Sequence, residues 1–329
     1  MTFLVIDLLN RPCLNFLAET KFNFVKSRKL YYAISTLFIV GGMISMGMRG
    51  LDYGVEFTGG RSYTVEFKEP AKYNEIQRTL GDLFVEGERK ITPEVKMIEN
   101  KYNAKITTNY MINSDEKNAD SLVEAIMLKG LAKFGVVETD IKSSRKIDPV
   151  ISTTFKRSAI VSVILSVVIM FLYIMIRFRK WQYGLGTAVA LIHDVLFVIG
   201  MYSMLHGIMP FTMEVDQAFI AAILTIMGYS INDTVVVFDR IREYMRGGRK
   251  DPQDVLINDA LNSTLSRTVN NSITIFVVLF AIFFFGPESI KGFTFTLMVG
   301  VVVGTYSSIC VATPILIDFA TKKKVVDKR

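Results

Sequence analysis

Residues 220–243 read IAAILTIMGYSINDTVVVFDRIRE, and this stretch decides the class of protein. Its first half is apolar enough to lie in a bilayer, and the helical pattern continues without a break through Ser230, Asn232 and Asp233. A carboxylate at the centre of a membrane-spanning helix costs about 2.5–3.5 kcal/mol or more, so it usually faces a partner or water inside a bundle. We therefore predict that Asp233 carries protons. The alternative is a structural aspartate that a neighbouring helix satisfies.

The composition of the whole chain agrees with a membrane protein. Half of its 329 residues are hydrophobic, and they come in blocks of about 20 residues, the length that spans a bilayer. The net charge of +7 is better explained by basic loops at the cytoplasmic face than by nucleic-acid binding. Two distant cysteines, Cys13 and Cys310, and two histidines, His193 and His206, predict neither a disulfide framework nor a metal site.

Apolar blocks predict six transmembrane helices. They cover residues 30–48, 159–176, 185–205, 217–238, 269–285 and 292–317. Residues 49–149, between the first two, are polar and show the alternation and helical spacing of a soluble α+β domain. Strands are expected at 62–67, 95–99, 105–110 and 136–147, and helices at 73–84 and 118–134. This β-α-β-β-α-β order is that of the ferredoxin-like motif. The predicted fold class is an all-α membrane domain of six helices with a small ferredoxin-like exported domain.

The distribution of basic residues predicts the orientation of the chain. Lys and Arg crowd residues 1–29, the loop between the second and third spans, the connector 239–268 and the tail 318–329. With six spans, these four places lie on one side of the membrane. Both termini are therefore expected in the cytoplasm, with residues 49–149 on the other side of the membrane. A short amphipathic helix is expected at 255–265 in the connector.

Further polar residues are expected near Asp233. Arg267 lies at the cytoplasmic mouth of the fifth span, and Asn271, four residues later, shares its helix face. A helix shift that brings Arg267 to Asp233 would release a proton, because the positive charge favours the carboxylate. Asn232 belongs to the same predicted pathway. The alternative is a fixed ion pair that only locks the helices.

Asp194, in the third span, is a weaker candidate for this pathway. It is also explained as a structural residue that accepts hydrogen bonds from His193 or from hydroxyls on neighbouring helices. His193 itself is interpreted as a packing residue. Gly228 is expected to allow close packing of the fourth span.

A second signal, LDYGVEFTGG at residues 51–60, follows the first span. Gly59 and Gly60 allow backbone angles that other residues avoid. They suit a hinge between the span and the exported domain. The alternative, an ordinary turn into the first strand, is favoured by the physics alone.

These stretches together resemble the SecD and SecF family of protein-export membrane proteins. LDYGVEFTGG is similar to the D-F-x-G-G signature after the first span, with Asp52, Gly54, Phe57, Gly59 and Gly60 as its candidate residues. GYSINDTVVVFDRIRE and LNSTLSRTVNNSIT resemble the fourth span of the SecF members and the stretch that follows it, and IHDVL fits the third span. The resemblance covers residues 20–320.

Two departures from the family pattern concern the N-terminal part. Glu56 stands where the signature has Asp, although Asp52 is close by. Residues 1–20 have no clear counterpart, and the apolar run at 3–9 is too short to span a membrane. It is interpreted either as an interfacial segment or as the remnant of a preceding SecD half in a fused chain.

The resemblance implies a fold and a function. SecD and SecF each supply six helices to a pseudo-symmetric unit of the resistance-nodulation-division type. They join the SecYEG translocon, with YajC as an optional partner, and use the proton gradient to help pull preproteins across the inner membrane. Asp233 and Arg267 match the acid and the arginine that this family ties to proton conduction. Residues 61–147 would contact the emerging preprotein and swing. Membrane lipid is expected as surroundings, and no cofactor, metal, enzyme activity or nucleic acid is implied.

Three other classes of protein are alternatives to this interpretation. Intramembrane aspartyl proteases need Y-D and G-x-G-D arrangements, which His193-Asp194 and YSIND at 229–233 do not provide. A proton-driven lipid or drug exporter of the same superfold usually carries both halves in one chain and larger exported domains. A scaffold subunit of the translocon needs no conducting acid, and in that case Asp233→Asn should leave function intact.

Overall fold

The computed structural model describes residues 22–326, apart from short gaps at 70–72, 87–88, 99–101, 113–117, 148, 207, 210, 212 and 288–289. The predictions for residues 1–20, including the apolar run at 3–9, lie outside the described residues.

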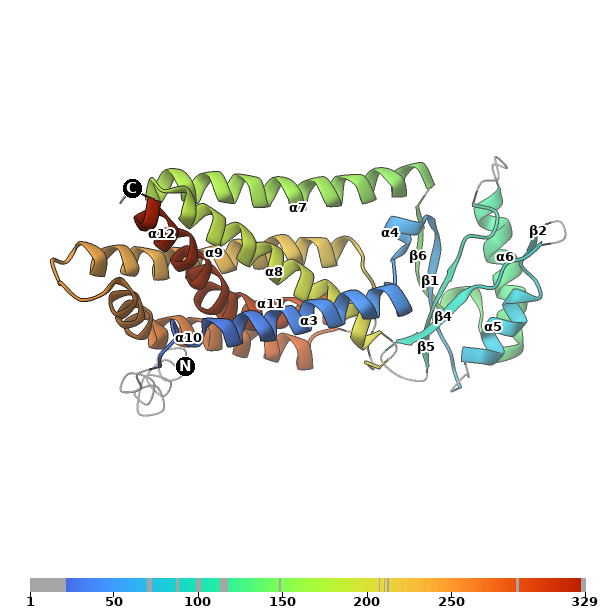
Figure 1. The fold of residues 1–329 in the computed structure, drawn as a ribbon. Coiled ribbons are helices and arrows are strands. Elements are labelled where there is room, and N and C mark those ends of the chain that lie inside the picture. Colours follow the sequence, from blue (N-terminus) through green and yellow to red (C-terminus); the bar gives the residue numbers. More distant parts are fainter. Residues whose placement is uncertain are drawn as a thin grey trace.

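Six helices in the described part of the chain are long and apolar enough to cross a membrane. They are α3 (Arg28–Arg49), α7 (Pro149–Phe178), α8 (Trp181–Leu205), α9 (Gln217–Arg246), α10 (Gln253–Phe285) and a last helix made of α11 (Lys291–Ser307), the π-helical turn η4 (Ser308–Ala312) and α12 (Thr313–Val326). They run lengthwise beside one another, with a small sheet domain at one end (Figure 1). The predicted fold class is confirmed.

The helices divide into an inner and an outer group. In the most apolar window of each helix, α8, α9 and the last helix have 44%, 50% and 67% of their residues buried, whereas α3, α7 and α10 have 11%, 6% and 6%. The outer helices are nevertheless apolar throughout, as expected of surfaces that face lipid or another membrane subunit. One close backbone contact fixes α3 on α8, because a Cβ on Gly42 would lie 2.7 Å from the Cα of Gly200.

Several helices extend beyond the apolar blocks in the sequence. α10 is continuous from Gln253, so the amphipathic segment at 255–265 and the apolar block at 269–285 form one helix. Neither Gly nor Pro interrupts residues 253–285, and nothing local ends the helix between them. Hydropathy marks the part of a helix that suits a membrane, whereas the helix ends where its capping or breaking residues lie.

The sheet domain, defined as residues 60–147, has the predicted β-α-β-β-α-β order. Its elements are β1 (Gly60–Glu66), α5 (Tyr73–Gly81), β4 (Glu94–Ile98), β5 (Asn103–Thr108), α6 (Ala119–Leu131) and β6 (Ile141–Ile147). The sheet order is β4-β5-β1-β6 with antiparallel neighbours, which is the ferredoxin-like arrangement. The sequence did not reveal the short hairpin of β2 (Val85–Glu86) and β3 (Arg89–Lys90), since two-residue strands are too short to show alternation.

The two faces of the sheet have different surroundings. α5 and α6 cover the face away from the membrane helices (Figure 1). There Tyr63, Val65 and Ile106 belong to a hydrophobic core that is separate from the core of the helix bundle. The opposite face is polar and looks toward the bundle. Strand alternation places Ser62 and Lys105 on this polar face, where both line a cavity.

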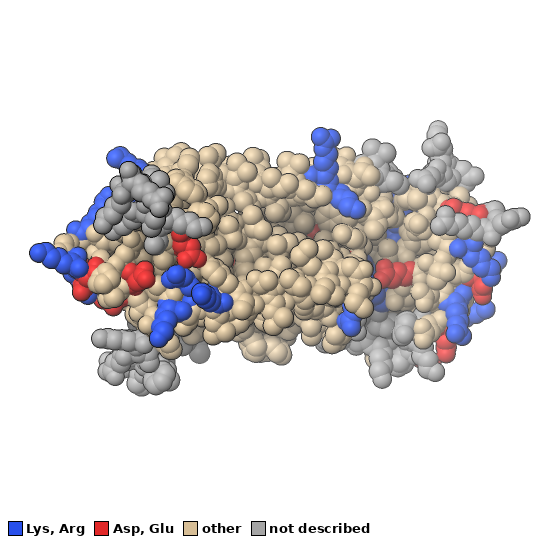
Figure 2. Space-filling model, viewed as in Figure 1, with Lys and Arg blue, Asp and Glu red and all other residues tan. Residues whose placement is uncertain are grey.

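The described chain starts near the end of the bundle that lies away from the sheet domain, and α12 also reaches that end (Figure 1). In space-filling view, charged side chains gather toward the two ends of the molecule and leave a broad band of other residues between them (Figure 2). This is the surface pattern of a protein that crosses a membrane.

Candidate functional site

Asp233 lies between three helices of the bundle. Its residue surface is 3% exposed. Thr305 of α11 donates a hydrogen bond to Asp233 Oδ2 over 3.4 Å, and the Thr305 hydroxyl lies 2.5 Å from Ser272 Oγ of α10. Ser272 Oγ in turn lies 2.8 Å from the hydroxyl of Tyr229, one helical turn before Asp233 on α9. A connected group of hydroxyls therefore surrounds the carboxylate.

Arg267 and Asn271 of α10 also face Asp233. The Asn271 amide is a polar neighbour of the carboxylate, and the Arg267 guanidinium acts on it at Coulombic range. In the described part of the chain, the Arg267 guanidinium does not come within 4.0 Å of the Asp233 carboxylate, so the two form no ion pair. The arrangement is thus an acid with an unpaired cation nearby, and the fixed ion pair weighed from the sequence is not formed in this structure.

The side of α9 and α10 next to this site is open in the single chain. Asn232, Arg267 and Asn271 are exposed, although they lie on helices of membrane length. Gly228 is exposed as well, and a Cβ there would meet no atom within 4 Å. Gly228 therefore makes no close contact with the other helices of this chain. The close contact to α11 is made instead at Gly300, where a Cβ would lie 2.1 Å from Ile226.

Asp194 has a different environment, because three polar side chains contact its carboxylate. It is fully buried and accepts hydrogen bonds from Ser230 Oγ at 2.7 Å and Ser307 Oγ at 2.9 Å. The ring Nδ1 of His193 lies 3.1 Å from its other oxygen. His193 Nε2 continues to Ser35 Oγ of α3 at 3.1 Å. These contacts are those expected of the structural interpretation of Asp194.

The sequence did not identify most of the individual hydroxyl residues that contact Asp233 and Asp194. Thr305, Tyr306 and Ser307 are consecutive on α11, and they reach Asp233, Ser35 and Asp194 respectively. The available signal was a run of hydroxyl residues in an otherwise apolar segment, followed at Ser308 by the π-helical turn. Such turns rotate the residues around them and are frequent at functional sites.

The glycine signature has a clear backbone explanation. Gly59 has φ of 71° and Gly60 has φ of 141°, which L-residues with a side chain rarely adopt. A Cβ on Gly60 would also lie 2.9 Å from the carbonyl oxygen of Thr108. Gly59 follows the short helix α4 (Val55–Thr58), and Gly60 begins β1. The pair makes the turn into the first strand.

The rest of the signature attaches to the segment before α9. The amide of Gly54 donates to the carbonyl of Val215 at 3.0 Å, and the amide of Val215 donates to the carbonyl of Asp52 at 2.6 Å. Phe57 packs against the core of the helix bundle. Residues 52–57 therefore fasten the sheet domain to the membrane helices.

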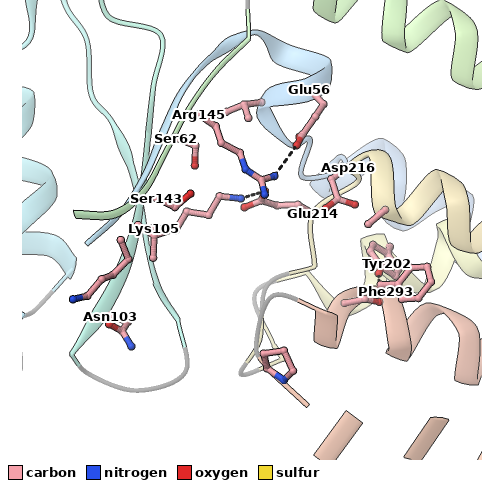
Figure 3. Close-up of a pocket in the computed structure, with 16 residues that line it drawn as sticks. Glu56, Ser62, Asn103, Lys105, Ser143, Arg145, Tyr202, Glu214, Asp216 and Phe293 are labelled. Carbon is pink, nitrogen blue, oxygen red and sulfur yellow. Dashed lines mark hydrogen bonds and ion pairs between the residues drawn. The ribbon is translucent and has the colours of Figure 1, made fainter. Parts of the chain in front are cut away.

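A charged cluster lies beside this attachment. Lys105 of β5 places its ammonium 2.5 Å from Glu214 Oε2, and Arg145 of β6 lies 3.9 Å from Glu56 Oε1, at the edge of a cavity of about 440 Å³ (Figure 3). Lys96 of β4 contacts the carboxylate of Asp52 and lies 3.3 Å from Glu214 Oε1.

Burial and charge act in opposite directions on the pKa values of this cluster. Burial raises the pKa of Asp52, and Lys96 only partly opposes it. Burial also acts to raise the pKa of Glu214, but the ammonium groups of Lys105 and Lys96 outweigh it and hold this pKa below its usual value. Burial acts to lower the pKa of Lys96, and Glu214 and Asp52 outweigh it, so this pKa is raised. The cluster therefore stays charged around Glu214. The described residues contain no group of three or more His, Cys, Asp or Glu that is placed to hold a metal.

A six-helix membrane domain with a buried acid, carrying a ferredoxin-like domain between its first two helices, defines a polytopic membrane protein of the transport class. Residues 127–322 match the family model described as "Protein export membrane protein SecD/SecF, C-terminal", and residues 44–71 match "SecD/SecF GG Motif". The chain belongs to the SecD/SecF family, in its SecF branch of protein translocase subunits, as the resemblance in the sequence predicted.

Individual SecF relatives are similar along almost the whole chain. "Protein translocase subunit SecF" of Rhodothermus marinus is 38% identical over 309 residues, which cover 92% of this chain and 95% of that protein. The SecF of Haemophilus influenzae is 34% identical over 301 residues, covering 92% of this chain and 87% of that protein. The exporter alternative loses its support, because these relatives are named as translocase subunits.

Fused SecDF proteins match over less than half of their length. SecDF of Thermus thermophilus is 30% identical over 308 residues, which cover 94% of this chain and 40% of that protein. Its crystal structure superimposes with a TM-score of 0.77 at 29% identity, covering 92% of this chain and 39% of the other. A SecDF structure in a super-membrane-facing form has a TM-score of 0.65. SecF works with SecD in the translocation machinery, and in the fused relatives both are one polypeptide.

Proposed function

We propose that this chain, together with SecD, uses the proton gradient to promote preprotein translocation across the inner membrane, with Asp233 as the coupling acid. The observation that carries the proposal is the environment of Asp233. It is buried among hydroxyls of three helices, and the Arg267 guanidinium is close but unpaired.

The contacts of Asp233 support proton transfer at this site. When Asp233 is protonated, its carboxyl needs no counter-charge and rests among Thr305, Ser272 and Tyr229. When it loses the proton, the carboxylate attracts Arg267, and the amide of Asn271 is beside it. Protonation and deprotonation of Asp233 therefore change the electrostatic attraction between α9 and α10. One charge that moves across 100 mV supplies about 2.3 kcal/mol, enough to bias a small domain movement.

The exposed polar groups near Asp233 support a second half-site from SecD. Asn232, Arg267 and Asn271 would be costly against lipid. SecD helices that cover this face would shield them and complete a pathway. Asp194 serves that pathway by holding α8, α9 and α11 together through its hydrogen bonds with Ser230 and Ser307.

The proposed topology follows from charge. Both termini are cytoplasmic and the sheet domain is periplasmic, because the short basic loops all lie at the end of the bundle opposite the sheet domain. In this orientation the sheet domain would meet a preprotein that emerges from SecYEG, and Gly59 and Gly60 would act as its hinge. YajC would join the same complex.

The test is preprotein translocation into inverted membrane vesicles, with and without a proton gradient, after ATP is removed. The variants are Asp233→Asn and, as a matched control, Asp251→Asn, which changes an exposed acid paired with Arg249. We expect the gradient to speed translocation in the wild type and the control but not in Asp233→Asn. If Asp233→Asn responds like the wild type, Asp233 is structural and the chain acts as a scaffold.

A further inference from the structure

Glu214 connects the sheet domain to the helix that carries Asp233. Its side chain is 8% exposed, and two lysines from neighbouring strands hold its carboxylate. Lys105 of β5 lies 2.5 Å from Oε2 and Lys96 of β4 lies 3.3 Å from Oε1. We call Glu214, Lys96 and Lys105 the lysine latch. Figure 3 shows Lys105 pointing across the gap from the sheet to Glu214.

The segment that holds Glu214 is fixed to α9. Asp216, two residues later, caps the helix by accepting the amide hydrogen of Phe219 at 2.7 Å. α9 then runs as one helix from Gln217 to Arg246. At 1.5 Å per residue, Asp233 lies about 25 Å from the start of this rod. Any shift of α9 along its axis therefore moves Glu214 as well.

The junction around the latch is polar and hollow. The cores of the sheet domain and of the helix bundle are separate clusters, and a cavity of about 440 Å³ lies between the sheet and the bundle. Lysines and Arg145 of the sheet face Glu214 and Glu56 of the membrane side (Figure 3), and Lys96 also lies 3.1 Å from Glu94 of its own strand. Charge pairs across a hollow permit the domain to pivot while it stays attached, which tight apolar packing would resist.

We propose that Lys96 and Lys105 are the coupling residues of this protein, which transmit a movement of α9 through Glu214 to the sheet domain. The inference rests on the proposed role of Asp233 and adds the path by which its movement leaves the membrane. Asp52, which contacts Lys96 and follows α3, is a second carboxylate that holds Lys96 at this junction.

The first test separates proton flux from translocation in vesicles that hold the complex of this chain with SecD. The variant is Lys96→Gln with Lys105→Gln. Its control, Lys142→Gln, removes a lysine at the same cavity whose ion pair, 2.9 Å to Glu66, lies within the sheet domain. We expect the double variant to keep proton flux within about twofold of the wild type and to lose roughly fivefold or more of the gradient-driven stimulation, the scale of coupling between two sites. The control should keep both.

A second measurement guards against misfolding. A chain with Lys105→Cys and Glu214→Cys is joined by a short bis-methanethiosulfonate cross-linker, which dithiothreitol removes. We expect gradient stimulation with the cross-link in place and its loss after reduction, in the same sample. Chains that carry only Lys105→Cys or only Glu214→Cys control for reaction of the cross-linker with the native Cys13 and Cys310.

The outcomes distinguish this proposal from the one on which it rests. Equal responses of wild type and Asp233→Asn to the gradient would remove the proton-driven role itself. If the proton gradient no longer stimulates translocation in Asp233→Asn but fully stimulates it in the lysine double variant, the proposed coupling role of Lys96 and Lys105 is wrong. A joint loss of proton flux and translocation in the double variant, or a cross-link that restores nothing, would also overturn it.

Discussion

Thr305 donates a hydrogen bond to Asp233, and Ser307, two residues later on α11, donates to Asp194. One turn of a single helix thus serves two carboxylates that belong to α9 and α8. The π-helical turn starts at the next residue, Ser308. A rotation of this turn would change the surroundings of both acids together. Separate variants are therefore needed to tell the two hydrogen bonds apart.

Thr305→Val removes the hydroxyl that contacts Asp233 and keeps the shape of the side chain. A hydrogen bond to a charged group is worth about 1.5–3 kcal/mol, so we expect proton flux through the complex to fall roughly tenfold or more. Folding should be retained, because Thr305 is half-buried. Proton flux in vesicles and thermal unfolding measure the two effects. The control is Thr274→Val, on an exposed position of α10. Unchanged flux would exclude Thr305 from the pathway.

Asp194→Ala should act mainly on stability. It leaves the hydroxyls of Ser230 and Ser307 and the ring of His193 without their buried acceptor. A buried donor without a partner costs roughly 1–3 kcal/mol. We expect a clearly lower unfolding temperature of the detergent-solubilised chain, whereas Asp233→Asn should unfold near the wild-type temperature. If the two variants unfold alike, Asp194 is not the structural acid of this pair.

The sequence predicted the parts of this protein that follow from local pattern. Apolar blocks revealed the six helices, and Asp233 was conspicuous because its neighbours Ile231 and Val235 are apolar. The ferredoxin-like order also followed from alternation and helical spacing.

The remaining features depend on contacts that no local pattern encodes. The lysine latch joins Glu214 to residues more than a hundred positions earlier, and only the docking of the sheet domain brings them together. The sequence could not show which helix Gly228 meets, because a glycine in a helix gives the same pattern whether it faces its own bundle or a partner. The sequence predicted hydroxyl partners for Asp194 but not which Ser or Thr residues they are, because such residues are common in membrane helices.

Gly60→Ala tests the turn into the first strand. Gly60 has a positive φ, and an added Cβ would lie 2.9 Å from a backbone oxygen of Thr108, which a strand cannot easily move. We expect a loss of roughly 1–3 kcal/mol in the stability of the sheet domain, the usual scale of such strain. Hydrogen exchange of β1 and β5 in the full chain should become faster. Gly47→Ala, a helical position with no atom within 4 Å, is the control. Equal exchange in both would contradict the strain argument.

A pH effect is expected at the buried Arg61. Its guanidinium donates to Asp120 Oδ1 at 2.9 Å and 2.6 Å and to the carbonyl of Tyr110 at 2.6 Å. The hydrogen bond from Arg61 holds the pKa of Asp120 below its usual value. Because the folded pKa is the lower one, the stabilisation is complete above the ordinary aspartate pKa of about 4 and is lost as the pH falls through the folded pKa.

The measurement is hydrogen exchange of β1 as a function of pH, corrected for the intrinsic exchange rate. Protection in the wild type should fall below pH of about 4, and in Asp120→Asn this step should be absent. Asp82→Asn, which breaks an exposed pair with Lys90, is the control and should keep the step. A wild-type curve without the step would show that Arg61 does not depend on the charge of Asp120.

Gly228→Leu tests the face that this chain offers to SecD. Within the chain a side chain at Gly228 meets nothing, so leucine is tolerated by the fold and removes a flexible residue from a helix. Helices in a membrane approach each other closely at small residues, and a leucine at such a contact would hold SecD away. We expect normal thermal unfolding of the chain alone and a reduced yield of SecD in co-purification. The matched control is Val277→Leu, an exposed apolar position on α10 more than a helical turn beyond Asn271. If Gly228→Leu retains SecD as the wild type does, the partner covers another face of the bundle, and the exposed Asn232, Arg267 and Asn271 need a different explanation.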